Sequence, residues 1–272
     1  MHPALSPRLI AFTAASLAGV PAIAQPSLMI TQGTTMYRYQ GGVVSTFANM
    51  GDVISGMTNV PSGMTVGSMN GGASDGDILA VGRNGVYRVD NPSGTPTLTQ
   101  IGTRGGPNAS PIFVGGRMFG VAGVLPQGST LVEWDPTTFA QVDQWSMGVF
   151  GGPGGLVAVP GSMDEFYYSE FNTDMMYHYR RGDLFSTPVC TTPNNDYVGL
   201  EMVGGTIYAS YALPGTRQLV LGTQALDGNF TQLAVLDTYG DGITGLAQII
   251  PSPGALAILA IGAIRCARQR GR

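Results

Sequence analysis

The sequence predicts an all-β protein, a five-bladed β-propeller that its C-terminal strand closes into a ring. Glycine (41 residues) and proline (18) are abundant among the 272 residues, whereas charged residues make up 11%. This composition argues against a helical bundle or a coiled coil. Short segments with strand periodicity recur about every 45 residues. Four strands in a unit of that length are typical of a propeller blade.

The most regular segment of each repeat is predicted to be its third strand. In the first four repeats, aromatic or β-branched residues occupy alternate positions with a polar residue between them, which indicates a strand. Turn-forming residues follow each segment. The second residues of the five segments are 50, 45, 45 and 43 positions apart. The segments are 36–39, 86–89, 131–134, 176–179 and 219–222.

The flanking segments repeat with the same spacing. Second strands are predicted at 28–32, 78–82, 118–122, 165–169 and 206–211, and fourth strands at 43–48, 97–101, 140–147, 184–190 and 230–236. Glycine-rich apolar segments at 54–60, 111–114, 155–159 and 198–203 are predicted as the first strands of four units. Six blades would require strands in residues 61–76, whose composition favours a loop. A two-sheet sandwich gives no reason for a 45-residue recurrence.

The first unit lacks a first strand, and the chain ends with a strand too many. The extra segment, residues 243–249, resembles the first strand that begins at Ile54. Each follows a Gly-Asp pair and one further residue, Gly51-Asp52 in one case and Gly240-Asp241 in the other. Pairing the extra strand with the first unit would remove two open sheet edges. We therefore predict that residues 243–249 pair with residues 27–32.

The first 24 residues are predicted to be a secretory signal peptide. Arg8 supplies a positive charge, residues 9–20 are apolar, and the small residues Ala22 and Ala24 precede a cleavage point before Gln25. The alternative is a buried N-terminal helix. A cleavage motif that follows a helix-breaking proline disfavours this alternative.

The last 22 residues, 251–272, are predicted to be a C-terminal sorting signal, which leaves residues 25–250 as the propeller domain. An apolar run covers residues 254–264. As a helix it would rise about 16 Å, roughly half the hydrocarbon thickness of a bilayer. An ordinary amphipathic helix is the alternative, but the run has no polar face. Proline-rich and basic residues flank the run: Pro251, Ser252 and Pro253 before it, and Arg265, Arg268, Arg270 and Arg272 after it.

This arrangement resembles the PEP-CTERM sorting signal, which exosortase-type transpeptidases handle in bacteria with an outer membrane. The resemblance implies an exported protein, tethered for a time to the inner membrane by its tail. The arginine cluster would stay on the cytoplasmic side. The resemblance further implies an exosortase-type enzyme as a partner and a final location in the periplasm, at the cell surface or outside the cell.

Charge and cysteine content limit the function further. The sequence contains no lysine, which excludes a lysine Schiff base and a P-loop lysine. Between the two end segments lie eight arginines and 17 carboxylates, a net charge of −9. Such a domain should be repelled by nucleic acids and by anionic membrane surfaces. Because Cys266 lies in the tail, Cys190 has no partner in the domain and no intramolecular disulfide is expected.

Acidic residues in the loops before the predicted first strands form a candidate metal site. Asp52, Asp196 and Asp241 occupy similar positions, at what would be one mouth of the propeller. Converging oxygen ligands of this kind suit Ca²⁺. The alternative is that each aspartate caps its own turn through local backbone N–H groups.

The sequence predicts no catalytic constellation. Cys190 and His178 are predicted on adjacent strands, with Cys190 opposite about Asp174 and therefore roughly 13 Å from His178 along the strand. His178 is instead expected to hydrogen-bond across its blade. Glu165 and Glu170 should point to opposite faces of one strand, which disfavours paired-carboxylate chemistry.

These observations predict an exported binding or scaffold protein that uses the loops of a rigid propeller. Its ligand would be a surface glycan or another protein. Two alternatives stay open: a Ca²⁺-dependent hydrolase of lactone or sugar substrates, and a structural component of the extracellular matrix.

Overall fold

The computed structural model describes residues 25–103, 109–124, 128–149, 152–170, 173–193, 198–238 and 244–250. These residues form β-strands and turns without a helix, which confirms the predicted all-β class. They therefore contain no helix with the length and hydrophobicity needed to cross a bilayer.

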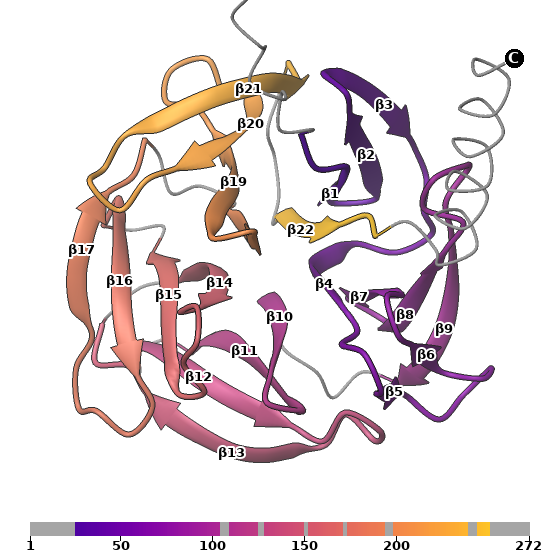
Figure 1. Ribbon diagram of the computed structural model, residues 1–272, viewed down its shortest axis with the longest axis horizontal. Coiled ribbons are helices and arrows are strands. Elements are labelled where there is room, and N and C mark those ends of the chain that lie inside the picture. The colour runs from indigo at the N-terminus through magenta and orange to yellow at the C-terminus, as the bar shows by residue number, and fades with distance from the viewer. Residues whose placement is uncertain are drawn as a thin grey trace, which may run out of the picture.

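Five four-stranded antiparallel sheets stand around a centre, as Figure 1 shows, and each sheet is one blade. Blade 1 contains β22 (Thr244–Gln248), β1 (Leu28–Gln32), β2 (Thr35–Gln40) and β3 (Val43–Phe47). Blade 2 contains β4 (Ile54–Asn59), β7 (Ile78–Gly82), β8 (Gly85–Asp90) and β9 (Thr97–Thr103). Blade 3 contains β10 (Ala109–Val114), β11 (Arg117–Val124), β12 (Gly128–Trp134) and β13 (Gln141–Ser146).

The two remaining blades follow the same order from the centre outwards. Blade 4 contains β14 (Pro153–Ala158), β15 (Glu165–Glu170), β16 (Met175–Arg180) and β17 (Thr187–Thr191). Blade 5 contains β18 (Gly199–Val203), β19 (Thr206–Ala212), β20 (Leu219–Gln224) and β21 (Phe230–Asp237). The predicted five-bladed propeller is confirmed.

Strand β22 closes the ring, as predicted. It pairs antiparallel with β1, with Leu28 opposite Gln248 and Gln32 opposite Thr244. The N–H of Ile249 donates to the carbonyl of Ser27 at 2.7 Å, so the pairing continues one residue further. In Figure 1 the yellow β22 lies beside the indigo β1. Blade 1 is therefore built from both ends of the domain, which removes the open edges that either end would leave alone.

Apolar side chains fill the spaces between neighbouring blades. Five clusters of buried residues occupy the five junctions of the ring. At the junction of blades 5 and 1, for example, Leu219 and Leu221 pack with Leu28 and Tyr37, all of them buried. Burying a side chain of this size contributes about 1.5–3 kcal/mol. The blades are thus joined mainly by hydrophobic contact.

Glycines let the innermost strands approach each other closely. A Cβ atom on Gly245 of β22 would lie 2.8 Å from the carbonyl carbon of Gly56 in β4. A Cβ atom on Gly56 would lie 2.5 Å from the backbone nitrogen of Ser110 in β10. Side chains at these positions would push the strands apart, so the glycine content of the first strands follows from the narrow centre of a five-bladed ring.

Two details differ from the sequence-based expectation. Residues 61–76, predicted as a loop, contain the short strands β5 (Thr65–Val66) and β6 (Ala73–Ser74), which form a separate two-stranded hairpin. Its residues Val66 and Ala73 are buried at the junction of blades 2 and 3, so packing orders a segment whose composition is typical of loops. The hairpin is not a sixth blade.

The pairing of β16 with β17 is the second difference. Cys190 lies opposite Met176 and not opposite Asp174, because the turn is centred further along the chain and a bulge follows Met176. The expected cross-blade partner of His178 is present: its Nε2 lies 3.0 Å from Oε2 of Glu165 on β15.

Candidate functional site

The inner strands have two ends, and these define two faces of the ring. The face where β22 ends also carries the loops that join each first strand to the second, and we call it the tail face. These loops are residues 60–77, 115–116, 159–164 and 204–205. The loops that enter the first strands, including the one with Asp52, lie on the opposite face.

On the opposite face, Asp52 is buried and fully engaged in hydrogen bonds. Its carboxylate accepts hydrogen bonds from the backbone N–H groups of Val53 and Asn84, the side-chain amide of Asn84 and the hydroxyl of Tyr87. Burial, followed by this bond to Asp52, raises the pKa of Tyr87 to about 12. Asp52 therefore ties the loop before β4 to the turn between β7 and β8, which extends the predicted capping role.

The other two candidate metal ligands, Asp196 and Asp241, lie outside the described residues. Among the residues that the structure does describe, no three His, Cys, Asp or Glu side chains are grouped as a metal site requires. The Ca²⁺ site therefore stays a prediction, and for Asp52 it would require several of the hydrogen bonds above to be given up.

A pocket of about 550 Å³ opens on the tail face, at the ends of the inner strands of blades 2 to 5. Its walls are mostly apolar, and we call it the mouth pocket. The lining comes from the end of β4 (Thr58, Asn59), the end of β10 (Ile112, Phe113, Val114), the end of β14 with its loop (Val157, Ala158, Pro160, Met163) and β18 (Glu201, Met202). Apolar pockets of this volume are typical of small-molecule sites.

Glu201 is the one charged side chain among the described residues that line the mouth pocket. It lies within β18, opposite Tyr208 of β19, and it is half-buried. Burial raises its pKa to about 8, and neither a hydrogen bond nor a neighbouring charge contributes to that shift. A carboxyl group therefore lies in an apolar recess, and none of the described residues supplies a partner that stabilises its ionised form.

The polar side chains around Glu201 are used in the fold. The amide of Asn59 donates to the carbonyl of Gln248 at 2.7 Å and accepts from the Gln248 N–H at 3.1 Å. The hydroxyl of Ser162 accepts from the backbone N–H groups of Asp164 and Glu165. These contacts fix the rim of the mouth pocket, and Glu201 remains the one charged side chain among its described lining residues.

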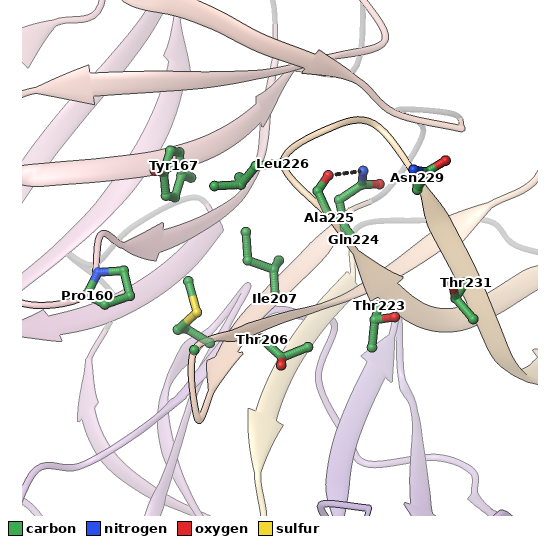
Figure 2. A pocket seen from close by; sticks show the side chains of 12 residues that line it. Pro160, Tyr167, Thr206, Ile207, Thr223, Gln224, Ala225, Leu226, Asn229 and Thr231 are labelled. Carbon is green, nitrogen blue, oxygen red and sulfur yellow. Dashed lines mark hydrogen bonds between the residues drawn. The ribbon is translucent and has the colours of Figure 1, made fainter.

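A second pocket, of about 300 Å³, lies on the tail face between blades 4 and 5 (Figure 2). Tyr167 of blade 4 lines one side, and Ile207 and Gln224 of blade 5 line the other. The side-chain amide of Gln224 donates to the carbonyl of Ala225 at 2.9 Å. This pocket shares Pro160, Met202 and Gly205 with the mouth pocket, so the two recesses are neighbours.

Exposed apolar side chains occupy the loops of the same face. Met163, at the rim of the mouth pocket, is 56% exposed, and Leu226, at the rim of the second pocket, is 43% exposed. Leu184 and Phe185, in the turn between β16 and β17, are 80% and 71% exposed, but they lie outside the lining of both pockets and beside Gly148, in the loop that enters β14.

A second acidic group with a perturbed pKa is Glu170, at the end of β15. Its side chain is fully buried, and Ser129 donates a hydrogen bond to Oε1, whereas Oε2 has no partner among the described atoms. Burial raises the pKa of Glu170 to about 7. Strand alternation had placed Glu165 and Glu170 on opposite faces. It did not indicate that Glu170 would be enclosed.

Comparisons with known proteins identify no family for this chain. No protein-family model and no curated protein matches the chain. Among solved structures, a nidogen/laminin complex chain is 11% identical with a TM-score of 0.45, covering 83% of this chain and 99% of that one. A protein of unknown function from Bacteroides caccae is 12% identical, with a TM-score of 0.47 and coverages of 84% and 100%. Regucalcin, a calcium-binding protein from Agrobacterium tumefaciens, is 11% identical with a TM-score of 0.40, covering 73% of this chain and 66% of that chain.

Proposed function

We propose that this protein is an exported binding β-propeller whose ligand occupies the mouth pocket. The observation that carries the proposal is the pocket itself: a mostly apolar recess of about 550 Å³, built from the strand ends of four blades, with one carboxyl group that has no partner among the described residues. Ligand sites commonly combine apolar walls with a few polar groups that fix orientation. The hydrogen-bonded rim around Asn59 keeps the pocket in shape before a ligand arrives.

Export enters the proposal through the two end segments. The signal-peptide pattern before Gln25 and the sorting-signal pattern after residue 250 support a protein that leaves the cytoplasm and is held for a time at the inner membrane. Ile250 lies two residues after the end of β22, on the same face as the mouth pocket. While the tail is embedded, this face is turned toward the bilayer, and removal of the tail by an exosortase-type enzyme exposes it.

The site can be tested without knowing the natural ligand. Screening a library of small fragments by two-dimensional NMR should give hits whose largest shifts fall on residues 112–114, 157–159 and 201–205. Replacing Met202 by Trp should fill the pocket and abolish those shifts, whereas the matched replacement of exposed Leu184 by Trp should leave them unchanged. Hits that scatter over the surface, or that gather on the opposite face, would overturn the proposal.

A further inference from the structure

We propose that the ligand of the mouth pocket is a cation, an ammonium or guanidinium group carried on an apolar body, and that Glu201 is its counterion. This inference rests on the proposed function and names the chemistry of the same site. The juxtaposition of one carboxyl group with apolar walls carries it.

The charge of the pocket points to a cation. The arginines with described partners on neighbouring parts of the ring are engaged elsewhere: Arg117 pairs with Glu133, and Arg181 pairs with Asp164. No arginine in the described part of the chain contributes to the pKa of Glu201. An anionic ligand would meet the Glu201 carboxylate without a compensating positive charge, whereas a cation would form a charge-assisted hydrogen bond, which is about twice as strong as a neutral one.

The walls of the pocket point to an apolar body. Phe113, Met163 and Met202 offer hydrocarbon surface from β10, the loop after β14 and β18. A sugar would need several hydrogen-bonding partners for its hydroxyl groups, but the side chain of Asn59 is already bonded to Gln248. A glycan, the first ligand class expected from the sequence, therefore fits this pocket less well than an alkyl or aryl amine.

The environment of Glu201 favours binding of such a cation over binding of a neutral molecule of equal size. Partial burial makes ionisation of the carboxyl group unfavourable, since no described residue supplies a compensating charge. A ligand cation supplies that charge at short range, within a recess where water screens the pair less than at the open surface. Binding of a neutral molecule of equal size gains only the apolar contact.

Two sources can provide this chemistry, a free amine and an arginine or lysine side chain of a peptide. Hexylamine and its neutral counterpart hexanol probe the first. The peptide acetyl-Leu-Leu-Arg-amide and the same peptide with citrulline in place of arginine probe the second. Calorimetric titration of the purified protein at about pH 9, where Glu201 is ionised, measures all four affinities, and NMR shifts locate each probe.

We expect hexylamine to bind the mouth pocket about tenfold more tightly than hexanol. In Glu201→Gln this preference should vanish, while hexanol binds as before. The matched variant Glu165→Gln, on the same ring but outside the pocket lining, should keep the preference. An arginine peptide that binds more tightly than hexylamine identifies a protein partner as the source, and the opposite order identifies a free amine.

Two other results would overturn the inference in distinguishable ways. Equal shifts of the pocket residues by hexylamine and hexanol, unaffected by Glu201→Gln, would keep the binding site and reject the cation. The absence of shifts at residues 112–114 and 201–205 with every probe and every fragment would reject the binding site as well.

Discussion

The side-chain amide of Asn59 bonds both the N–H and the carbonyl of Gln248, a residue 189 positions away in the sequence. Strand β22 is therefore held from two sides, by its ladder with β1 in blade 1 and by this amide at the end of β4 in blade 2. The ladder with β1 closes the ring within blade 1. The contact with Asn59 joins blade 1 to blade 2 at the rim of the mouth pocket.

Replacing Asn59 by Ala should weaken this closure. Both hydrogen bonds are lost and the backbone groups of Gln248 are left without that partner, so the free energy of unfolding should fall by about 1–3 kcal/mol. Chemical denaturation measures the change, and hydrogen exchange should accelerate at residues 244–248. The exposed Gln141→Ala serves as the control and should change stability by less than about 0.5 kcal/mol. Unchanged exchange in β22 would show that the ladder with β1 suffices.

Gly245→Ala tests the close approach at the centre. The added methyl group would meet the backbone of Gly56 and Met57, which no side-chain rotation can relieve. Overpacking of this kind costs about 1–3 kcal/mol, so the melting temperature should fall. In contrast, Ala225→Gly at an exposed turn should have little effect. A variant as stable as the wild type would mean that the inner strands can separate at low cost.

The buried carboxyl group of Glu170 should make stability depend on pH. Its pKa is about 7 in the folded protein and 4.5 as an ordinary carboxyl group. The folded state therefore binds the proton more tightly, and the free energy of unfolding should fall as pH rises from about 4.5 to about 7, by up to about 3 kcal/mol. Glu170→Gln cannot ionise.

Urea unfolding of both proteins between pH 4 and pH 9 measures the effect. The stability of the variant relative to the wild type should rise across that window and level off above about pH 8. Asp143→Asn, which changes an exposed carboxyl group on β13, is the control. A difference between Glu170→Gln and the wild type that is constant with pH would refute the assigned pKa.

Asp52 is expected to stabilise the loop before β4 and the turn between β7 and β8 through its hydrogen bonds. Asp52→Asn replaces an acceptor of four hydrogen bonds by a group that presents an N–H to donors, and we expect a loss of about 1–3 kcal/mol. The loss should be equal with and without Ca²⁺. If Ca²⁺ instead raises the melting temperature of the wild type and not of the variant, the predicted site of Asp52, Asp196 and Asp241 gains support.

The processed ends can be measured directly. Mass spectrometry of the protein recovered from outside the cytoplasm should give an N-terminus at Gln25 and a C-terminus within or before residues 251–272. An intact tail bearing Arg265 to Arg272 in the released protein would contradict removal by an exosortase-type enzyme.

Strand alternation and turn residues were enough to locate the blades, because every blade repeats the same order of four antiparallel strands packed between its neighbours. The first unit lacks a first strand and residues 243–249 form an extra one. This was enough to predict closure of the ring, since an unpaired sheet edge at each end is costly. The register of Cys190 was wrong because a bulge after Met176 has no signal in composition.

The mouth pocket could not be read from the sequence. The aspartates predicted a site on the face opposite the tail face, where the loops enter the first strands. Turns favour aspartate whether or not the aspartate binds a ligand, as Asp52 illustrates. The pocket walls come from strand ends such as Ile112 and Val157, which are indistinguishable in sequence from core positions. Glu201 becomes noteworthy only when its neighbours across the ring are known.

The position of β22 also sets the order of events during synthesis. Three of the four strands of blade 1 are present once residue 47 is made. Its fourth strand, β22, lies nearest the centre of the ring and is made after the strands of every other blade. The ring cannot close before β22 is available to pair with β1. This pairing is the most distant in sequence, so it should form last and limit the folding rate.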